Sequence, residues 1–333
     1  MPRLLAVALA LIGLICAALL AQDSGSGANS KNQNPTIRTS VHLVLVPVTV
    51  TDAKGKFIDG LNPENFVLYD DGVPQRQFQV DSSDTVLAPV AMVVAIQSSG
   101  ISQAALDKIH KVGGMFQPLL SGEKGEVAVL EYDREINVVQ EFTRDSSKIS
   151  GAFESINGRV IKVGRMLDAV VEGVKLLEKT PESYRRMMLI LGESRDRGSR
   201  TKLAQAIEFA QRANVTMYPM TYSAQATGWT TKPEDTTTLP TDPDYAGGIV
   251  ELMRMTTANA AEEFAKWTGG RHLSFGRLEG LEDAISRLSG EIHSQYLLSF
   301  VPAESSNKGL HRILVQVRSP KGAVVRARPA YWP

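Results

Sequence analysis

The sequence has 333 residues, of which 43% are hydrophobic and 22% are charged, an ordinary balance for a chain that buries a sizeable core. Lysine plus arginine and aspartate plus glutamate number 36 each, so the formal net charge is zero. Nucleic-acid binding draws most of its affinity from clustered basic residues. The sequence shows no such cluster, and we expect no nucleic-acid partner.

The first 21 residues have the features of a secretory signal peptide. Arg3 supplies a positive charge, Leu4 to Leu20 is an apolar run, and Ala21-Gln22 suits signal-peptidase cleavage. The alternative is a retained membrane anchor, although the run is slightly short for a span. Cleavage after Ala21 would remove Cys16, the single cysteine. The mature protein would then be periplasmic or secreted, without a membrane span, a disulfide or a thiol.

Two segments precede the main domain. Residues 22–39 are rich in Ser, Gly, Asn and Gln, which is typical of a flexible linker. Residues 40–85 predict a β segment with strands near Val41–Val50, Phe66–Tyr69 and Gln75–Val80. Turn residues such as Asp-Gly separate these strands and favour antiparallel pairing.

Residues 86–293 alternate between strand and helix patterns. Ala91–Ile96 and Met187–Leu191 are continuously apolar, as parallel strands covered on both faces should be. Apolar residues at helical spacing lie between the strands. Residues 223–248 have no apolar period and predict a long surface insertion. The pattern indicates an α/β fold with a doubly wound, mostly parallel, Rossmann-like sheet.

Residues 294–333 return to strand patterns, at Tyr296–Val301, His311–Val317 and Ala323–Arg328. Because isolated hairpins are rarely stable, we expect them to pair with the N-terminal β segment. The two ends of the chain would then form a small β domain, a β-sandwich, beside the α/β domain.

The order of several short motifs resembles that of von Willebrand factor A-related proteins of acidobacterial type. The N-terminal β segment matches from Val46 to Gly72, including Gly60-Leu61 and Asp71-Gly72. Later motifs match at Thr268-Gly269-Gly270 and at Tyr296 to Pro302. The resemblance covers nearly all of the predicted mature chain, and it implies a von Willebrand factor A fold and a role in binding rather than catalysis.

In that family, oxygen ligands from three loops hold a divalent cation at the carboxyl edge of the sheet, in a metal-ion-dependent adhesion site. This sequence departs from the pattern at almost every position. Gln97 replaces the first Asp, Ile101 replaces a Ser, Gly164 replaces the Thr and Leu191 aligns with the second Asp, while Ser99 is kept. The resemblance therefore implies a degenerate site, and we expect no metal and no cofactor.

The same edge is the predicted ligand site, through Gln97, Ser98, Ser99, Arg165, Glu193, Arg195 and Asp196. The alternatives are that the edge is a structural turn, or that binding occurs elsewhere. A different alignment, with Glu193 or Asp196 in place of Leu191, would favour a cation-dependent adhesion domain.

We expect no enzymatic activity. The five histidines form no His-Glu-x-x-His pair, and no Gly-x-Ser-x-Gly elbow or P-loop is present. The leading hypothesis is a binding module of the cell envelope with a protein or cell-surface partner. A structural scaffold and, more weakly, a hydrolase with residues 223–248 as its lid are the alternatives.

Overall fold

The computed structural model describes residues 43–81, 88–101, 103–116, 125–222, 259–275, 278–302 and 309–332. The predicted signal peptide, the linker at residues 22–39 and the insertion at residues 223–248 lie outside these ranges. In the described part of the chain, no helix has the length and apolar character needed to cross a membrane.

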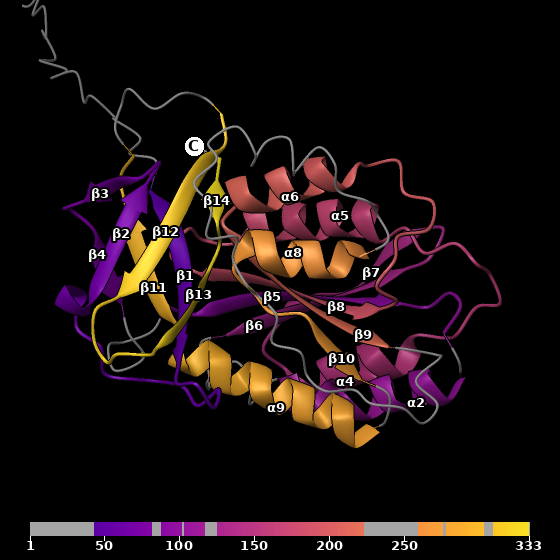
Figure 1. Cartoon of the computed structure of the whole chain (residues 1–333). Helices are drawn as coiled ribbons and strands as arrows, with labels where there is room; N and C mark the ends of the chain where they lie inside the picture. The colour runs from indigo at the N-terminus through magenta and orange to yellow at the C-terminus, as the bar shows by residue number, and fades with distance from the viewer. Residues whose placement is uncertain are drawn as a thin grey trace, which may run out of the picture. The chain divides into compact units, whose positions relative to one another are not determined.

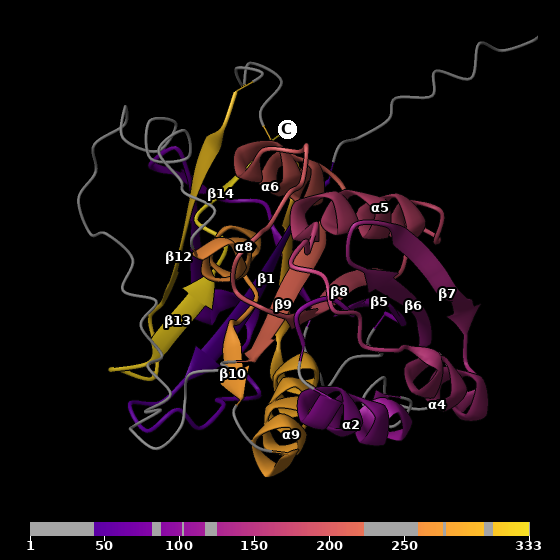
Figure 2. The same cartoon turned by 90° about the vertical axis from the view of Figure 1, so that its right-hand side faces the viewer.

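A six-stranded sheet forms the centre of the α/β domain (Figure 1). Its order is β10 (Leu273–Phe275), β9 (Val215–Tyr222), β8 (Arg185–Gly192), β5 (Val90–Gln97), β6 (Glu126–Tyr132) and β7 (Ile136–Thr143). All neighbouring strands are parallel except β6 and β7, which pair antiparallel at the sheet edge seen in Figure 2. The sheet is therefore mixed, with a parallel majority.

Helices cover both faces of this sheet (Figure 1). One face carries α2 (Gln103–Val112), α4 (Ser146–Ser155) and α9 (Leu278–Ser294), and the other carries α5 (Met166–Glu178), α6 (Leu203–Arg212) and α8 (Ala260–Thr268). The side chains of β5 alternate between the two cores, which explains why the whole strand is apolar.

The two ends of the described chain form a separate β layer of two four-stranded sheets. The first has the order β13 (Val324–Ala327), β1 (Val44–Thr51), β11 (Tyr296–Phe300) and β4 (Gln79–Asp81). The second has the order β14 (Ala330–Tyr331), β12 (His311–Val317), β2 (Phe66–Asp70) and β3 (Val73–Gln75). Strands β1 and β2 each pair antiparallel with C-terminal strands, and one hydrophobic core contains residues of both sheets.

The prediction of one strand over Gln75–Val80 is wrong. The chain forms β3, which pairs with β2, and then β4, which pairs with β11 in the other sheet. Residues 76–78 carry the chain from one sheet to the other, so neither strand extends across this segment.

A buried carboxylate joins the β layer to the α/β domain. Glu291 of α9 is 1% exposed, and its Oε2 atom lies 2.6 Å from Nη2 of Arg326 in β13 and 2.9 Å from Nε of Arg271. The Nη2 group of Arg326 also donates to the Thr49 hydroxyl on β1. The Glu291 carboxylate therefore joins α9 to Arg271 and to β13, and Arg326 extends this contact to β1.

Replacing Glu291 with Gln is expected to destabilise the fold by about 3 kcal/mol, because two partly buried guanidinium groups lose the charge of their shared, buried carboxylate. Urea unfolding of the purified protein measures this change. Glu282→Gln, at an exposed position of the same helix, is the control and should change the free energy of unfolding by less than about 0.5 kcal/mol. Equal stability of the two variants would contradict this role of Glu291.

Candidate functional site

Three loops meet at the carboxyl edge of the parallel strands, where open α/β sheets bind ligands. The first loop follows β5 from Ser98 to Ile101, the second comprises residues 157–165 before α5, and the third comprises residues 193–200 after β8. Isolated bridges join Ser99 to Arg159 and Gly164 to Arg197. The predicted convergence of the three loops is therefore present.

The side-chain amide of Gln97 lies at the centre of these loops and is 4% exposed. Its Nε2 group donates to the Ser99 carbonyl oxygen at 2.9 Å, and its Oε1 atom accepts from the Glu193 backbone N–H at 2.8 Å. A carboxylate at this position would have no N–H to donate to Ser99. The neutral amide thus bonds in ways that the Asp of a cation site could not reproduce.

Glycine is needed on two sides of this amide. A Cβ atom at Gly164 would lie 2.8 Å from Gln97 Nε2, and a Cβ atom at Gly192 would lie 2.6 Å from Gln97 Oε1 and 2.5 Å from the Tyr132 hydroxyl. Separations this short force a neighbour to move. Gln97 and Gly164 are separate departures from the family pattern in the sequence. In the structure they depend on each other, because the glycine leaves room for the amide.

Leu191, the residue predicted to stand in place of the second Asp, lies in a hydrophobic core. Leu191 is fully buried and packs in the same core as Val94 and Ile96, because β8 continues to Gly192. The carboxylate nearest the first loop belongs to Glu193, whose Oε1 atom would lie 3.6 Å from a Cβ atom at Gly100. The Glu193 carboxylate is paired with Arg197 at 2.9 Å.

Arg165 and Asp196 both hold the start of α5. Asp196 Oδ1 accepts from the Leu167 backbone N–H at 3.0 Å and from the Ser199 hydroxyl at 2.6 Å. Arg165 pairs with Asp168 at 2.6 Å and donates to the Arg134 carbonyl oxygen. A carboxylate that caps a helix N-terminus in this way is stabilising, so both side chains are engaged within the protein.

The charge of Asp168, the partner of Arg165, is also stabilised by contacts within the protein. Burial alone would raise the pKa of this carboxyl, but hydrogen bonds from Thr201 and from the Arg200 backbone, together with the charge of Arg165, outweigh burial. The pKa of Asp168 therefore lies below its ordinary value, and the group stays charged at neutral pH.

The exposure of the predicted ligand residues divides them into two groups. Gln97, Ser98 and Ser99 are almost fully buried, so a macromolecular partner cannot touch them without moving the loops. Arg195 is exposed, and the Glu193 side chain is 25% exposed. The direct contact role predicted for Gln97, Ser98 and Ser99 is not supported by this geometry, because their side chains point inside.

Most of the accessible residues of this edge were not among the predicted ligand residues, with Arg195 as the exception. Val160 is fully exposed at the tip of the second loop. Exposed cationic side chains, which we call the basic rim, lie on the second and third loops: Arg159, Lys162, Arg195, Arg197 and Arg200. Periodicity gives no signal for exposure within a loop, so only the folded arrangement identifies these residues.

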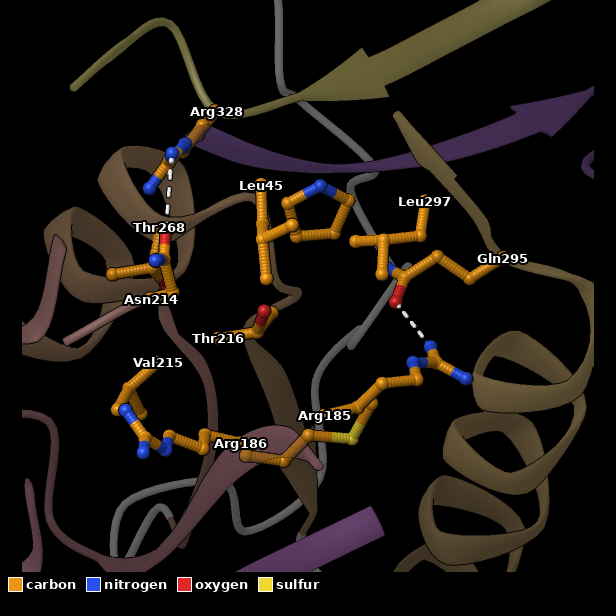
Figure 3. Close-up of a pocket in the computed structure, with 12 residues that line it drawn as sticks. Leu45, Arg185, Arg186, Asn214, Val215, Thr216, Thr268, Gln295, Leu297 and Arg328 are labelled. Atoms are coloured by element: carbon orange, nitrogen blue, oxygen red, sulfur yellow. Dashed lines mark hydrogen bonds between the residues drawn. The ribbon is translucent and has the colours of Figure 1, made fainter. Parts of the chain in front are cut away.

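A second candidate site is a pocket at the opposite, amino edge of the sheet (Figure 3). It has about 390 Å³ of empty space, part of it open to solvent. Strands β1 and β11 of the β layer and the first residues of β8 and β9 line it. Its polar lining residues, none of which was a predicted ligand residue, are Arg185, Arg186, Arg328, Asn214, Thr216, Thr268 and Gln295.

The arginines of this pocket stabilise helix ends. Arg185 donates to the Ile292 carbonyl oxygen at the end of α9 and to Gln295 Oε1 at 2.7 Å, Arg186 donates to the Ala213 carbonyl oxygen after α6, and Arg328 donates to the Gln211 carbonyl oxygen within α6. Cations are favourable at helix C-termini, where carbonyl groups lack helical partners. The pocket is therefore explained as a structural junction.

No protein-family model matches the chain, and no curated protein matches it in sequence. Among solved structures it is similar to a von Willebrand factor type A protein from Catenulispora acidiphila (TM-score 0.46, 9% identity, 77% of this chain and 73% of that one). It is also similar to the vWF domain of the pilus tip protein Mfa5 from Porphyromonas gingivalis (0.45, 10%, 62% and 96%). A third is BatB from Bacteroides thetaiotaomicron (0.41, 13%, 60% and 99%).

Replacing Gln97 with Ala is expected to lower the free energy of unfolding by about 1–3 kcal/mol, because the Ser99 carbonyl and the Glu193 N–H lose their buried partner. Chemical denaturation measures the change. Gln103→Ala removes an exposed side chain near the start of α2 and should change stability by less than about 0.5 kcal/mol. A Gln97→Ala protein as stable as the parent would show that the amide does not hold the loops.

Proposed function

We propose that this protein is an exported, non-catalytic binding module of von Willebrand factor A type, which holds its partner at the carboxyl edge of the sheet without a metal ion. The observation that carries the proposal is the Gln97 amide. Both of its polar groups are bonded to backbone within the site, and a neutral amide supplies no charge to a cation. The loops are held together by this amide in place of a bound ion.

The accessible part of the edge suits an acidic protein partner. Loops one to three carry six basic residues, Arg159, Lys162, Arg165, Arg195, Arg197 and Arg200, and two acidic residues, Glu193 and Asp196. Both acidic side chains are engaged within the protein. An acidic surface with a small apolar recess for Val160 would complement this edge in charge and in shape.

Two further parts of the proposal rest on the sequence. Export is supported by the basic and apolar pattern of residues 1–21, followed by a small-residue cleavage site. The non-catalytic assignment is supported by the lack of recognisable nucleophile, phosphate-binding and zinc-protease motifs in the sequence.

A photo-cross-linking amino acid at position 160 tests the binding edge. In envelope extracts of the host cell, the proposal predicts one dominant adduct that persists in excess EDTA. The same cross-linker at Val324, which is also exposed but lies on β13, is the matched control and should not give this adduct. Mass spectrometry of the adduct would identify the partner and the charge of its contacting surface.

Charge reversal separates binding from folding in the same assay. Lys162→Glu combined with Arg195→Glu changes two exposed side chains, and should reduce the adduct at least tenfold while leaving the melting temperature unchanged. No adduct at position 160 in the parent would favour a scaffold without a ligand site at this edge. Loss of the adduct in EDTA would instead favour cation-dependent adhesion.

A further inference from the structure

Two carboxylates and an imidazole meet in the β layer, away from the carboxyl edge of the central sheet. Asp70 ends β2, Asp71 follows it in the turn to β3, and His311 begins the neighbouring strand β12. One ligand atom from each of these residues lies within 4.8 Å of the others. The cluster forms because β2 and β12 pair antiparallel, with Asp70 opposite Ile313. His311, two residues before Ile313, therefore lies beside the turn that follows Asp70.

The candidate ligand atoms face one another. His311 Nδ1 lies 2.8 Å from Asp71 Oδ2 and 3.8 Å from Asp70 Oδ1. Asp70 is 8% exposed and His311 is 5% exposed, and Asp70 Oδ1 has no hydrogen-bond partner. A buried carboxylate oxygen without a partner is costly and calls for an explanation such as a missing ion.

The second oxygen of each carboxylate is held by a protein donor. The Tyr331 hydroxyl donates to Asp70 Oδ2 at 3.0 Å, and the Arg312 backbone N–H donates to Asp71 Oδ1 at 2.8 Å. The Tyr331 ring also stacks on the His311 ring, with 5.2 Å between centroids. Donors of this kind orient ligating carboxylates in metal sites, so each carboxylate presents a fixed oxygen toward the imidazole.

From these contacts we propose that Asp70, Asp71 and His311 bind a divalent transition-metal ion, with Zn²⁺ as the best match. Zn²⁺ accepts imidazole nitrogen and carboxylate oxygen at about 2.0–2.2 Å, so one ion can bridge atoms that are 2.8 and 3.8 Å apart. The ion would join a turn of the N-terminal segment to a strand of the C-terminal segment. It would act as a structural clamp in a protein whose predicted mature form has no disulfide.

Calorimetric titration of the purified protein with Zn²⁺ tests this site. The expected result is saturable binding with one ion per chain, together with a rise in melting temperature, as linkage requires. Asp71→Asn keeps the acceptor for the Arg312 N–H but weakens the ligand set, and should reduce the affinity at least tenfold. His311→Gln should do the same.

Asp52→Asn is the matched control, because Asp52 is a turn residue of the same β layer that accepts two backbone N–H groups. It should bind Zn²⁺ like the parent. Titration with Co²⁺ reports the ligands directly, since its visible absorption should appear in the parent and be lost in His311→Gln. The proposal is overturned if the parent shows no saturable binding, or if Asp71→Asn and His311→Gln bind Zn²⁺ as the parent does.

Discussion

The hydrogen bonds of the Gln97 side chain set the chemistry of the carboxyl edge. One neutral amide donates to the first loop and accepts from the third, and the second loop approaches it so closely that a Cβ atom at position 164 would force the amide to move. An amide can both donate and accept, whereas a carboxylate can only accept. The Gln97 side chain therefore joins the first and third loops through hydrogen bonds within the protein.

At the amino edge of the sheet, charged side chains stabilise the ends of helices. Helices α5, α6 and α9 end there, and Arg185, Arg186 and Arg328 donate to carbonyl groups at or just beyond their ends. Burial lowers the pKa of Arg328 to about 10, yet the guanidinium remains charged at neutral pH. The β layer packs over this edge, so the carboxyl edge is the end of the sheet with accessible loops.

Much of the fold could be predicted from the sequence, because long apolar runs and apolar residues at helical spacing are local signals. The run at Ala91–Ile96 predicted a strand covered on both faces, and the side chains of β5 do alternate between two cores. The chain-end strands also pair, as the instability of lone hairpins suggested.

Other features depend on contacts that no local pattern encodes. The end of β8 was placed one residue too early, at Leu191, because Gly192 resembles a turn residue and its burial beside Tyr132 is visible only after folding. The exposure of Val160 and the approach of Asp71 to His311 are likewise results of the tertiary structure. The sequence placed the predicted ligand residues on three loops that do meet, but it did not show which of their side chains face solvent.

The most direct test of the central claim is calorimetric titration of the Asp71→Asn protein with Mg²⁺ and Ca²⁺ at neutral pH. This background weakens the β-layer cluster, and the edge variants Ser99→Ala and Glu193→Gln then show whether any remaining heat comes from the carboxyl edge. Because the Gln97 amide occupies the centre of that edge, the account predicts no saturable heat and no change in melting temperature at millimolar metal. Binding of one ion per chain that is lost in Ser99→Ala or Glu193→Gln would contradict it.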